Sequence, residues 1–208
     1  MPSAYNPQKD VFNIIDGKKQ PVNPYDMSGK KKQEPHLESL RFDGERLTAF
    51  AVNKEGRRFS FSLPADSGFP LDENHSVFDY SPQRQQQKDE GPIPEGTYTV
   101  NPKEIQHLNL IDEAIGMAGA LAKKKLGRFP GGSIPWGNCR IPITQTEEQA
   151  QKTKRDGFSI HGGKRRGSAG CIDLTDKDEK FCEFIEKYRG KNQTSVPLTV
   201  EYPKNRKK

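Results

Sequence analysis

Hydrophobic and polar residues alternate in short runs along most of the chain, and turn residues separate the runs. In residues 57–63, Phe59, Phe61 and Leu63 alternate with arginine and serine, so one face of this segment is expected to be buried. A similar run at residues 47–53 precedes it, and the short connection containing Gly56 predicts a hairpin. Further strands are expected at residues 37–42, 97–100, 139–143, 157–161 and 196–202.

Two segments have helical spacing instead. Between residues 103 and 126 the apolar positions are Leu108, Ile111, Ile115, Ala118 and Ala122. We expect this helix to be an insertion that packs against the sheet. A second apolar stripe consists of Phe181, Phe184, Ile185 and Tyr188, and Gly190 is a typical residue to follow the end of that helix. The predicted fold class is therefore mainly β (α+β), with two or three peripheral helices.

Composition divides the chain into three parts. Residues 1–38 are rich in proline, asparagine, glutamine and lysine, and we expect an extended arm with a role in delivery. Residues 39–203 are predicted to form one folded domain, and residues 204–208 a basic tail. Only 31% of the 208 residues are hydrophobic, which indicates a modest core with polar segments outside it.

Charge and hydropathy exclude several classes of protein. The formal net charge is +6, from 34 Lys and Arg against 28 Asp and Glu, and the basic clusters are spread along the chain. This spread is more typical of a solvated surface than of a nucleic-acid site, so we expect no nucleic-acid partner. No apolar run approaches the roughly 18 residues of a membrane span. The first ten residues also lack the apolar stretch of a secretory signal.

Three cysteines are too few for a disulfide framework, and they form no Cys-x-x-Cys metal pair. A bridge between Cys139 and Cys182 would leave Cys171 free, but the sequence does not decide whether that bridge forms.

The candidate chemistry lies in residues 158–174. A β-prone run ends at His161, a basic glycine-rich loop follows, and Cys171 opens a second apolar run. A lone cysteine is usually a small buried hydrophobic residue, and a lone histidine is usually a satisfied polar one. Together, at the two ends of one glycine-rich loop, they favour a nucleophilic thiol and its base.

Other loop residues have predicted roles around this pair. Gly170 lets the backbone approach closely, so that amides near Cys171 can stabilise an oxyanion. Ser168 is expected either to brace the loop or to bind substrate, and the cations at 164–166 are expected to favour the thiolate. The phosphate-binding pattern Gly-x-x-x-x-Gly-Lys-Ser/Thr is absent.

The run Ser168-Ala-Gly170-Cys171-Ile172, with His161 upstream, resembles the signature of the L,D-transpeptidases of the YkuD type. The short loop between histidine and cysteine is similar to that of type VI secretion effectors that attack peptidoglycan. Residues 40–68 and 91–98 fit the same subgroup, so the resemblance covers about residues 38–202. It implies a YkuD-like β-sandwich or barrel whose catalytic residues are Cys171, His161, Ser168 and Gly170.

Two positions depart from the usual family pattern. Typical members carry a histidine just before the motif glycine and an arginine or asparagine soon after the cysteine, where this chain has Ala169 and Asp173. Arg140 either supplies the missing cation for a substrate carboxylate or is a structural surface arginine. The expected substrate-binding residues are Gly162, Gly163, Arg140 and Arg166.

The resemblance also implies a reaction. Cys171 would attack the third residue of a tetrapeptide stem and expel the terminal D-alanine, with His161 as base and then acid. Hydrolysis, exchange with a D-amino acid and cross-linking all remain open. No metal or organic cofactor is needed.

Cell-wall chemistry without a signal peptide predicts synthesis in the cytoplasm, secretion by a contact-dependent machine, and action in the periplasm of a target bacterium. We expect an antibacterial toxin with peptidoglycan stem peptides as substrate, a cognate immunity protein and a secretion-machine carrier. The alternatives are a sortase-like or other cysteine peptidase acting on proteins, and a non-catalytic cell-wall-binding module.

Overall fold

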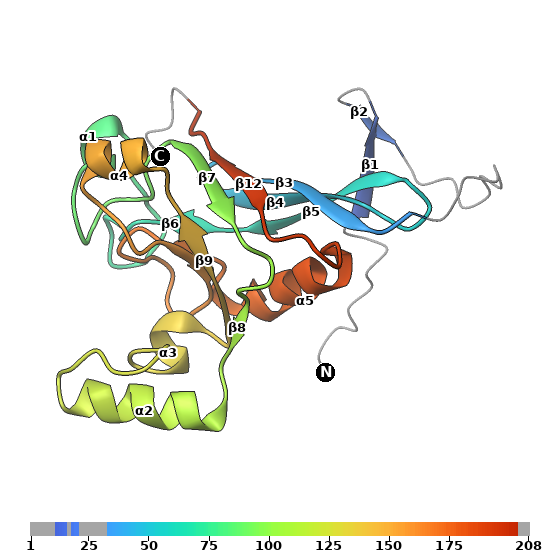
Figure 1. Cartoon of the computed structure of the whole chain (residues 1–208). Helices are drawn as coiled ribbons and strands as arrows, with labels where there is room; N and C mark the ends of the chain where they lie inside the picture. Colours follow the sequence, from blue (N-terminus) through green and yellow to red (C-terminus); the bar gives the residue numbers. More distant parts are fainter. Residues whose placement is uncertain (1–10, 16–17, 21–32, 204–208) are drawn as a thin grey trace.

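The computed structural model describes residues 11–15, 18–20 and 33–203 (Figure 1). The predicted arm at 1–38 lies mostly outside the described residues, and the basic tail at 204–208 lies wholly outside them. Within the arm, β1 (Val11–Ile15) pairs with β2 (Lys18–Gln20) and with the edge of the main sheet.

The described strands form one sheet with the order β2-β1-β5-β4-β3-β12-β7-β9-β10-β11-β6. Its remaining strands are β3 (His36–Phe42), β4 (Arg46–Val52), β5 (Arg58–Pro64), β6 (Asp66–Ser67), β7 (Gly96–Val100), β8 (Gln106–His107, paired with β9), β9 (Cys139–Thr144), β10 (Ser159–His161), β11 (Ile172–Asp173) and β12 (Val196–Val200). The sheet turns at β9, which pairs with β7 through Ile143 and Thr144 and with β10 through residues 140–142. This nearly closed, barrel-like sheet confirms the mainly β (α+β) prediction.

The alternating segments form strands where the pattern predicts them. β4 and β5 pair as an antiparallel hairpin from Leu47↔Leu63 to Val52↔Arg58. Phe59, Phe61 and Leu63 are all buried, because a period of two turns them toward the same side of the sheet. β6 is a two-residue strand that the sequence did not indicate, since so short a run has no periodicity.

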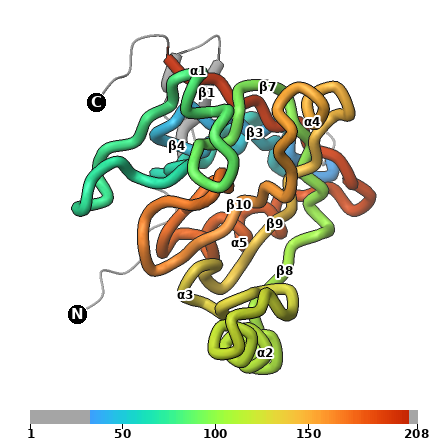
Figure 2. The backbone as a smooth tube through the Cα atoms, turned by 90° about the vertical axis from the view of Figure 1, so that its left-hand side faces the viewer, coloured from blue at the N-terminus to red at the C-terminus, as the bar shows by residue number. Residues whose placement is uncertain are grey.

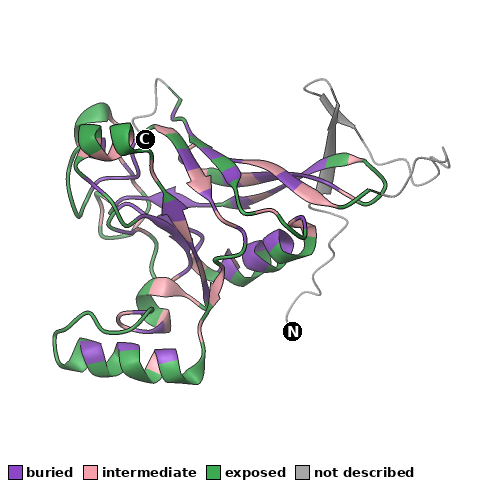
Figure 3. Ribbon diagram, in the orientation of Figure 1, coloured by how far each residue is buried: buried purple, intermediate pink, exposed green. Residues whose placement is uncertain are grey.

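The described helices are α1 (Pro82–Gln85), α2 (Leu110–Leu121), α3 (Ser133–Trp136), α4 (Glu147–Thr153) and α5 (Asp178–Tyr188), and a 3₁₀ turn spans Thr175–Lys177. Helix α5 has the predicted apolar stripe, on which Phe181 and Ile185 are fully buried. Figure 3 shows the buried and exposed positions along the elements of the molecule. In the described part of the chain, no helix has the length and apolar character needed to cross a bilayer.

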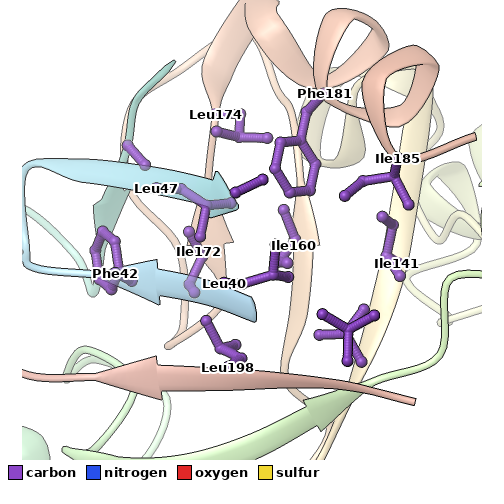
Figure 4. Packing of buried hydrophobic residues seen from close by; sticks show 14 of the residues in the cluster. Leu40, Phe42, Leu47, Ile141, Ile160, Ile172, Leu174, Phe181, Ile185 and Leu198 are labelled. Carbon is purple, nitrogen blue, oxygen red and sulfur yellow. The ribbon is translucent and has the colours of Figure 1, made fainter. Parts of the chain in front are cut away.

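The core lies where the sheet folds back on itself (Figure 4). Leu40 and Leu47 from β3 and β4 meet Ile160 and Ile172 from β10 and β11, and α5 closes the cluster with Phe181. The opposite faces of β10 and β11 are therefore free to carry polar side chains.

The prediction for residues 103–126 is wrong in two respects. Helix α2 is shorter than expected, and it stands apart from the sheet instead of packing on it (Figure 2). Ile111 is 71% exposed and Ile115 is 41% exposed. The reason is that the buried side of α2 carries Gly116 and Gly119, against which the following loop folds back.

Candidate active site

The parallel pairing of β10 and β11 brings the two ends of the glycine-rich loop together. Ile160 pairs with Ile172, and His161 pairs with Asp173. Neighbouring residues of a strand alternate between faces, and both isoleucines point into the core. The side chains of His161 and of Cys171, which directly precedes β11, therefore share the opposite face of the sheet.

Cys171 is a buried free thiol, with 9% of its surface exposed. Burial raises its pKa to about 11, because removal from water disfavours the thiolate. The backbone N–H of Ser159 donates to the sulfur and lowers this pKa, as do the charges of Arg140 and Arg155. With this pKa, Cys171 is a neutral thiol at neutral pH.

His161 is also buried, with 4% exposure, and its ring packs 4.8 Å from that of Trp136 between centroids. Burial lowers its pKa to about 4, and the charge of Arg140 lowers it further, against the effect of the Gly162 carbonyl. Nδ1 lies 2.5 Å from that carbonyl oxygen. Because a carbonyl only accepts, Nδ1 carries the proton and Nε2 carries the lone pair of a neutral base.

Hydrogen bonds brace the turn before Cys171. Ser168 Oγ donates to the Cys171 carbonyl at 2.6 Å and accepts from the Gly170 N–H at 3.3 Å. Ser67 Oγ donates to the Gly170 carbonyl at 3.2 Å. Of the two roles expected for Ser168, this geometry corresponds to bracing the loop.

Arg155 is a buried residue of the site that the sequence did not indicate. Its guanidinium donates to the carbonyls of Gln85, Gly91 and Pro92 at 2.7 Å, and to that of Ala169 at 3.3 Å. It thereby ties the turn that carries Cys171 to two distant loops. In a polar stretch that reads Lys-Arg-Asp, nothing distinguishes such an arginine from a solvated one.

Arg155 also explains why Gly170 is a glycine. Gly170 has a φ of +116°, and a Cβ atom there would lie 2.3 Å from Nη2 of Arg155. Both the backbone conformation and the space therefore require glycine directly before Cys171. The group that closely approaches the Gly170 backbone is a guanidinium of the same chain, and stabilisation of an oxyanion by amides near Cys171 stays a prediction.

Asp178, the first residue of α5, fixes the strand that runs alongside His161. Its carboxylate accepts the N–H groups of Asn138 at 2.7 Å and Cys139 at 2.8 Å. Cys139 is also joined to Cys182 of α5 by a disulfide, which settles the pairing that the sequence left open. β9 is thus attached to α5 both covalently and by a buried carboxylate.

Arg140 on β9 is the direct pairing partner of His161 on β10. Its guanidinium lies over the Trp136 ring, 4.4 Å from the centroid, and donates to the Arg128 carbonyl at 2.6 Å. The side chain is thus partly buried beside the site and differs from an ordinary surface arginine. Its charge acts on Cys171, as a cation beside a reacting thiol would.

The glycines after His161 use their amides inside the protein. Gly162 donates to the Trp136 carbonyl at 3.2 Å, and Gly163 donates to the Thr175 carbonyl at 3.0 Å. A Cβ atom on Gly162 would lie 2.4 Å from Cγ of Asp178. These contacts pack the loop against α3, and substrate binding by Gly162 and Gly163 stays a prediction.

Arg166 makes a bidentate ion pair with Asp66, with both N–O distances at 2.7 Å. It lines a cavity of about 300 Å³ together with Asp173, the pairing partner of His161. Burial raises the pKa of Asp173 to about 7, although its carboxylate accepts the amides of Gly167 and Thr175. The cations that lower the pKa of Cys171 are Arg140 and Arg155, and Arg166 is occupied by Asp66.

Among the described residues, no group of three or more His, Cys, Asp or Glu side chains could hold a metal ion. The chemistry available at the site is that of a thiol, an imidazole and nearby guanidinium groups.

Comparison with known proteins places this site in a family. One solved structure that is similar, "Structure of Bdellovibrio bacteriovorus Bd1075", is 16% identical with a TM-score of 0.43, over 78% of this chain and 46% of that one. This chain thus spans about half the length of that protein, and the likeness is too low to support an argument. A comparison with curated proteins gives no match. The family model of the Tlde1 domain matches residues 75–199, which include Arg140, Arg155, His161 and Cys171. This match covers more than half of the chain, which therefore belongs to the Tlde1 domain family, a family of type VI secretion effectors.

Proposed function

We propose that this effector is a cysteine-dependent peptidoglycan enzyme that removes or exchanges the terminal D-alanine of tetrapeptide stems. The observation that carries the proposal is the β10–β11 register, which turns His161 and Cys171 to the same face of the sheet. Membership of an effector family supports it, because a toxin must attack a structure of the target cell. The resemblance of the Ser168–Ile172 run to the YkuD-type signature supports the choice of stem peptides.

In this mechanism, Nε2 of His161 takes the proton of the Cys171 thiol as the sulfur attacks the carbonyl carbon of the third stem residue. The tetrahedral intermediate collapses, the C–N bond to D-alanine breaks, and His161 returns the proton to the leaving amine. A thioester remains on Cys171. Attack by water releases a shortened stem, whereas attack by the amine of a D-amino acid gives an exchanged one.

The surroundings fit a proton transfer coupled to attack. The Cys171 thiol and the His161 imidazole are both neutral at pH 7, since the pKa of Cys171 is about 11 and that of His161 is about 4. A neutral thiol beside a neutral imidazole can react only when the proton moves with the attack, or when a bound substrate changes the surroundings. Arg140, whose charge favours the thiolate, is the proposed partner of a substrate carboxylate.

The remaining predicted residues have supporting roles. Ser168 and Gly170 hold the turn that carries Cys171, and the proposal assigns stabilisation of the developing oxyanion to backbone amides near Cys171. The Gly162 carbonyl accepts a hydrogen bond from Nδ1–H of His161, and this bond fixes the tautomer of the proposed base.

The test is the mass of the product. Purified full-length protein is incubated with tetrapeptide muropeptides, with and without a D-amino acid. We expect loss or exchange of one alanine with the unaltered protein, and none with Cys171→Ser or His161→Gln. His36→Gln is the matched control, because that histidine begins β3, pairs with Val52 of β4, and its Nδ1 contacts the Glu34 carbonyl.

Two results would contradict the proposal in different ways. Unchanged muropeptides, with a folded protein whose Cys171 reacts with a thiol reagent, would point to another substrate, such as a protein. A folded protein with an unreactive Cys171 would favour a wall-binding module.

We further propose that the effector acts in the periplasm of the target cell, where a cognate immunity protein blocks it. Exporting the protein to the periplasm of a susceptible bacterium is expected to stop growth, whereas cytoplasmic expression and exported Cys171→Ser are expected to be harmless. Normal growth with exported, folded, unaltered protein would overturn this part of the proposal.

A further inference from the structure

Helix α2 presents its apolar side to the solvent. Leu110 is 89% exposed and Leu121 is 86% exposed, and Met117 lies between them on the same line of the helix. Ile111 and Ile115 extend this surface around the helix. We call these five residues the α2 apolar face. Over 12 residues the helix is about 18 Å long, so the face is a continuous strip.

The opposite side of α2 is held tightly by the chain that follows it. A Cβ atom on Gly116 would lie 2.1 Å from the Phe129 carbonyl oxygen, and one on Gly119 would lie 2.7 Å from that of Lys124. Asp112 pairs with Arg128, and Glu113 accepts from the backbone and hydroxyl of Ser133. These contacts prevent the helix from rotating to bury its apolar face, so the exposure is built into the fold.

Charge around the α2 apolar face is positive. Lys123, Lys124 and Lys125 follow the helix and are exposed. Asp112 and Glu113 are the acidic residues between 109 and 128, and both are engaged on the buried side of the helix. A partner that meets this surface therefore encounters aliphatic side chains beside three ammonium groups.

This combination fits an anionic lipid surface better than a protein. Protein interfaces are enriched in aromatic residues, methionine and arginine and depleted in lysine, whereas four of the five residues of the α2 apolar face are leucine or isoleucine and the three exposed cations that directly follow the helix are lysines. Interfacial helices place an aliphatic face among the acyl chains and lysines at the level of the headgroups. We propose that α2 and Lys123–Lys125 bind the surface of a bilayer that contains anionic phospholipid.

Binding of α2 to a bilayer would also fix the orientation of the candidate active site relative to that bilayer. The chain runs from α2 through α3 to Trp136, whose ring contacts that of His161. The candidate active site is therefore connected to the proposed lipid surface by a short segment, and the enzyme would work close to the membrane.

The experiment is sedimentation of the full-length protein with vesicles of phosphatidylglycerol and phosphatidylethanolamine, compared with phosphatidylcholine alone. We expect binding to the anionic vesicles that weakens with salt. Lys123→Gln/Lys124→Gln/Lys125→Gln should weaken it about 100-fold, at roughly fivefold per charge. Leu110→Gln/Leu121→Gln should weaken it at least about tenfold. Leu71→Gln, at an exposed leucine of another loop, should leave it unchanged.

Absence of binding to anionic vesicles at low salt would overturn the proposal, as would equal binding by Leu110→Gln/Leu121→Gln. Sedimentation velocity without vesicles tests whether a second copy of the chain, instead of lipid, covers the α2 apolar face. A dimer that this double variant converts to a monomer would show that a second copy of the chain covers the face, and would also overturn the proposal. None of these measurements depends on enzymatic activity, so their failure is distinguishable from failure of the proposed peptidoglycan chemistry.

Discussion

The turn that carries Cys171 and the segment that carries α2 are both fixed by close contacts, but the first buries its polar side chains, whereas the second leaves its apolar side chains in the solvent. Around Cys171, polar groups are buried and satisfied: Arg155 reaches four carbonyls, and Ser168 bridges the turn. Around α2, Gly116, Gly119 and Asp112 are buried, and the leucines are outside.

The difference concerns what each region gains from rigidity. Buried hydrogen bonds to charged groups are strong and directional, so they hold the turn that carries Cys171 in place. Close glycine contacts hold a helix in a fixed rotation while leaving its apolar surface available. The site region is thus held by buried polar contacts, whereas the α2 segment keeps its apolar side exposed, and three sets of variants can test this contrast.

The largest expected effect is that of Arg155→Met, which tests whether polar cross-links hold the Cys171 turn. It leaves four buried carbonyls without their donor, so we expect a loss of about 3–5 kcal/mol in the free energy of unfolding. Urea unfolding measures this. Arg58→Met is the matched control, because that exposed arginine pairs only at the surface with Glu38, and it should cost less than about 1 kcal/mol. Equal losses in the two variants would show that Arg155 is not a cross-link.

The next effect concerns pH, because the site region buries groups that titrate in opposite directions. The pKa of His161 falls from 6.5 to about 4 on folding, so its contribution to stability is present above pH 6.5 and is lost toward pH 4. The pKa of Asp173 rises from 3.8 to about 7, so its contribution is present below pH 3.8 and is lost as pH rises through 7. Between pH 4 and 6.5 the two largely cancel.

Removing either titrating group should reveal the pH dependence of stability that the other one causes. Relative to the unaltered protein, Asp173→Asn should lose about 3 kcal/mol of stability as pH falls from 6.5 to 4, and His161→Asn should gain a similar amount. Denaturant titrations at several pH values measure both differences. Slopes of the same sign in the two variants would contradict the burial of these groups.

The smallest expected effect is at α2. Leu110→Gln/Leu121→Gln should change the free energy of unfolding by less than about 0.5 kcal/mol, because both side chains are already in water. In contrast, Leu40→Ala in the core should cost about 2–5 kcal/mol. Thermal melts of both variants test this. A large loss in the α2 variant would mean that the α2 apolar face is covered in the free protein.

Much of the fold was predictable from local pattern. The β4–β5 hairpin and the stripe of α5 follow from period two and period 3.6, and both bury the residues that those periods select. The loop that joins His161 to Cys171 was also recognisable, because it connects two β-prone runs, and these runs pair as β10 and β11.

Long-range features were not predictable. Arg155 contacts carbonyls 63–70 positions away, as well as Ala169, and the local sequence carries no sign of them. Helix α2 was assigned the wrong buried side, because helical periodicity identifies an apolar face but not what that face meets. Gly162 and Gly163 were expected to bind substrate. Their amides donate to the carbonyls of Trp136 and Thr175, and the local sequence does not indicate these partners because they lie on other elements.

The disulfide between Cys139 and Cys182 has a topological consequence. It closes a macrocycle from two residues 43 positions apart, and that ring contains Arg140, Arg155, His161, Ser168, Cys171 and Asp173. A single protease cut anywhere inside the ring leaves the two pieces covalently joined, and a cut in the α2 segment leaves the ring itself intact. The residues proposed for catalysis therefore form one cyclic unit that no single backbone cleavage can separate.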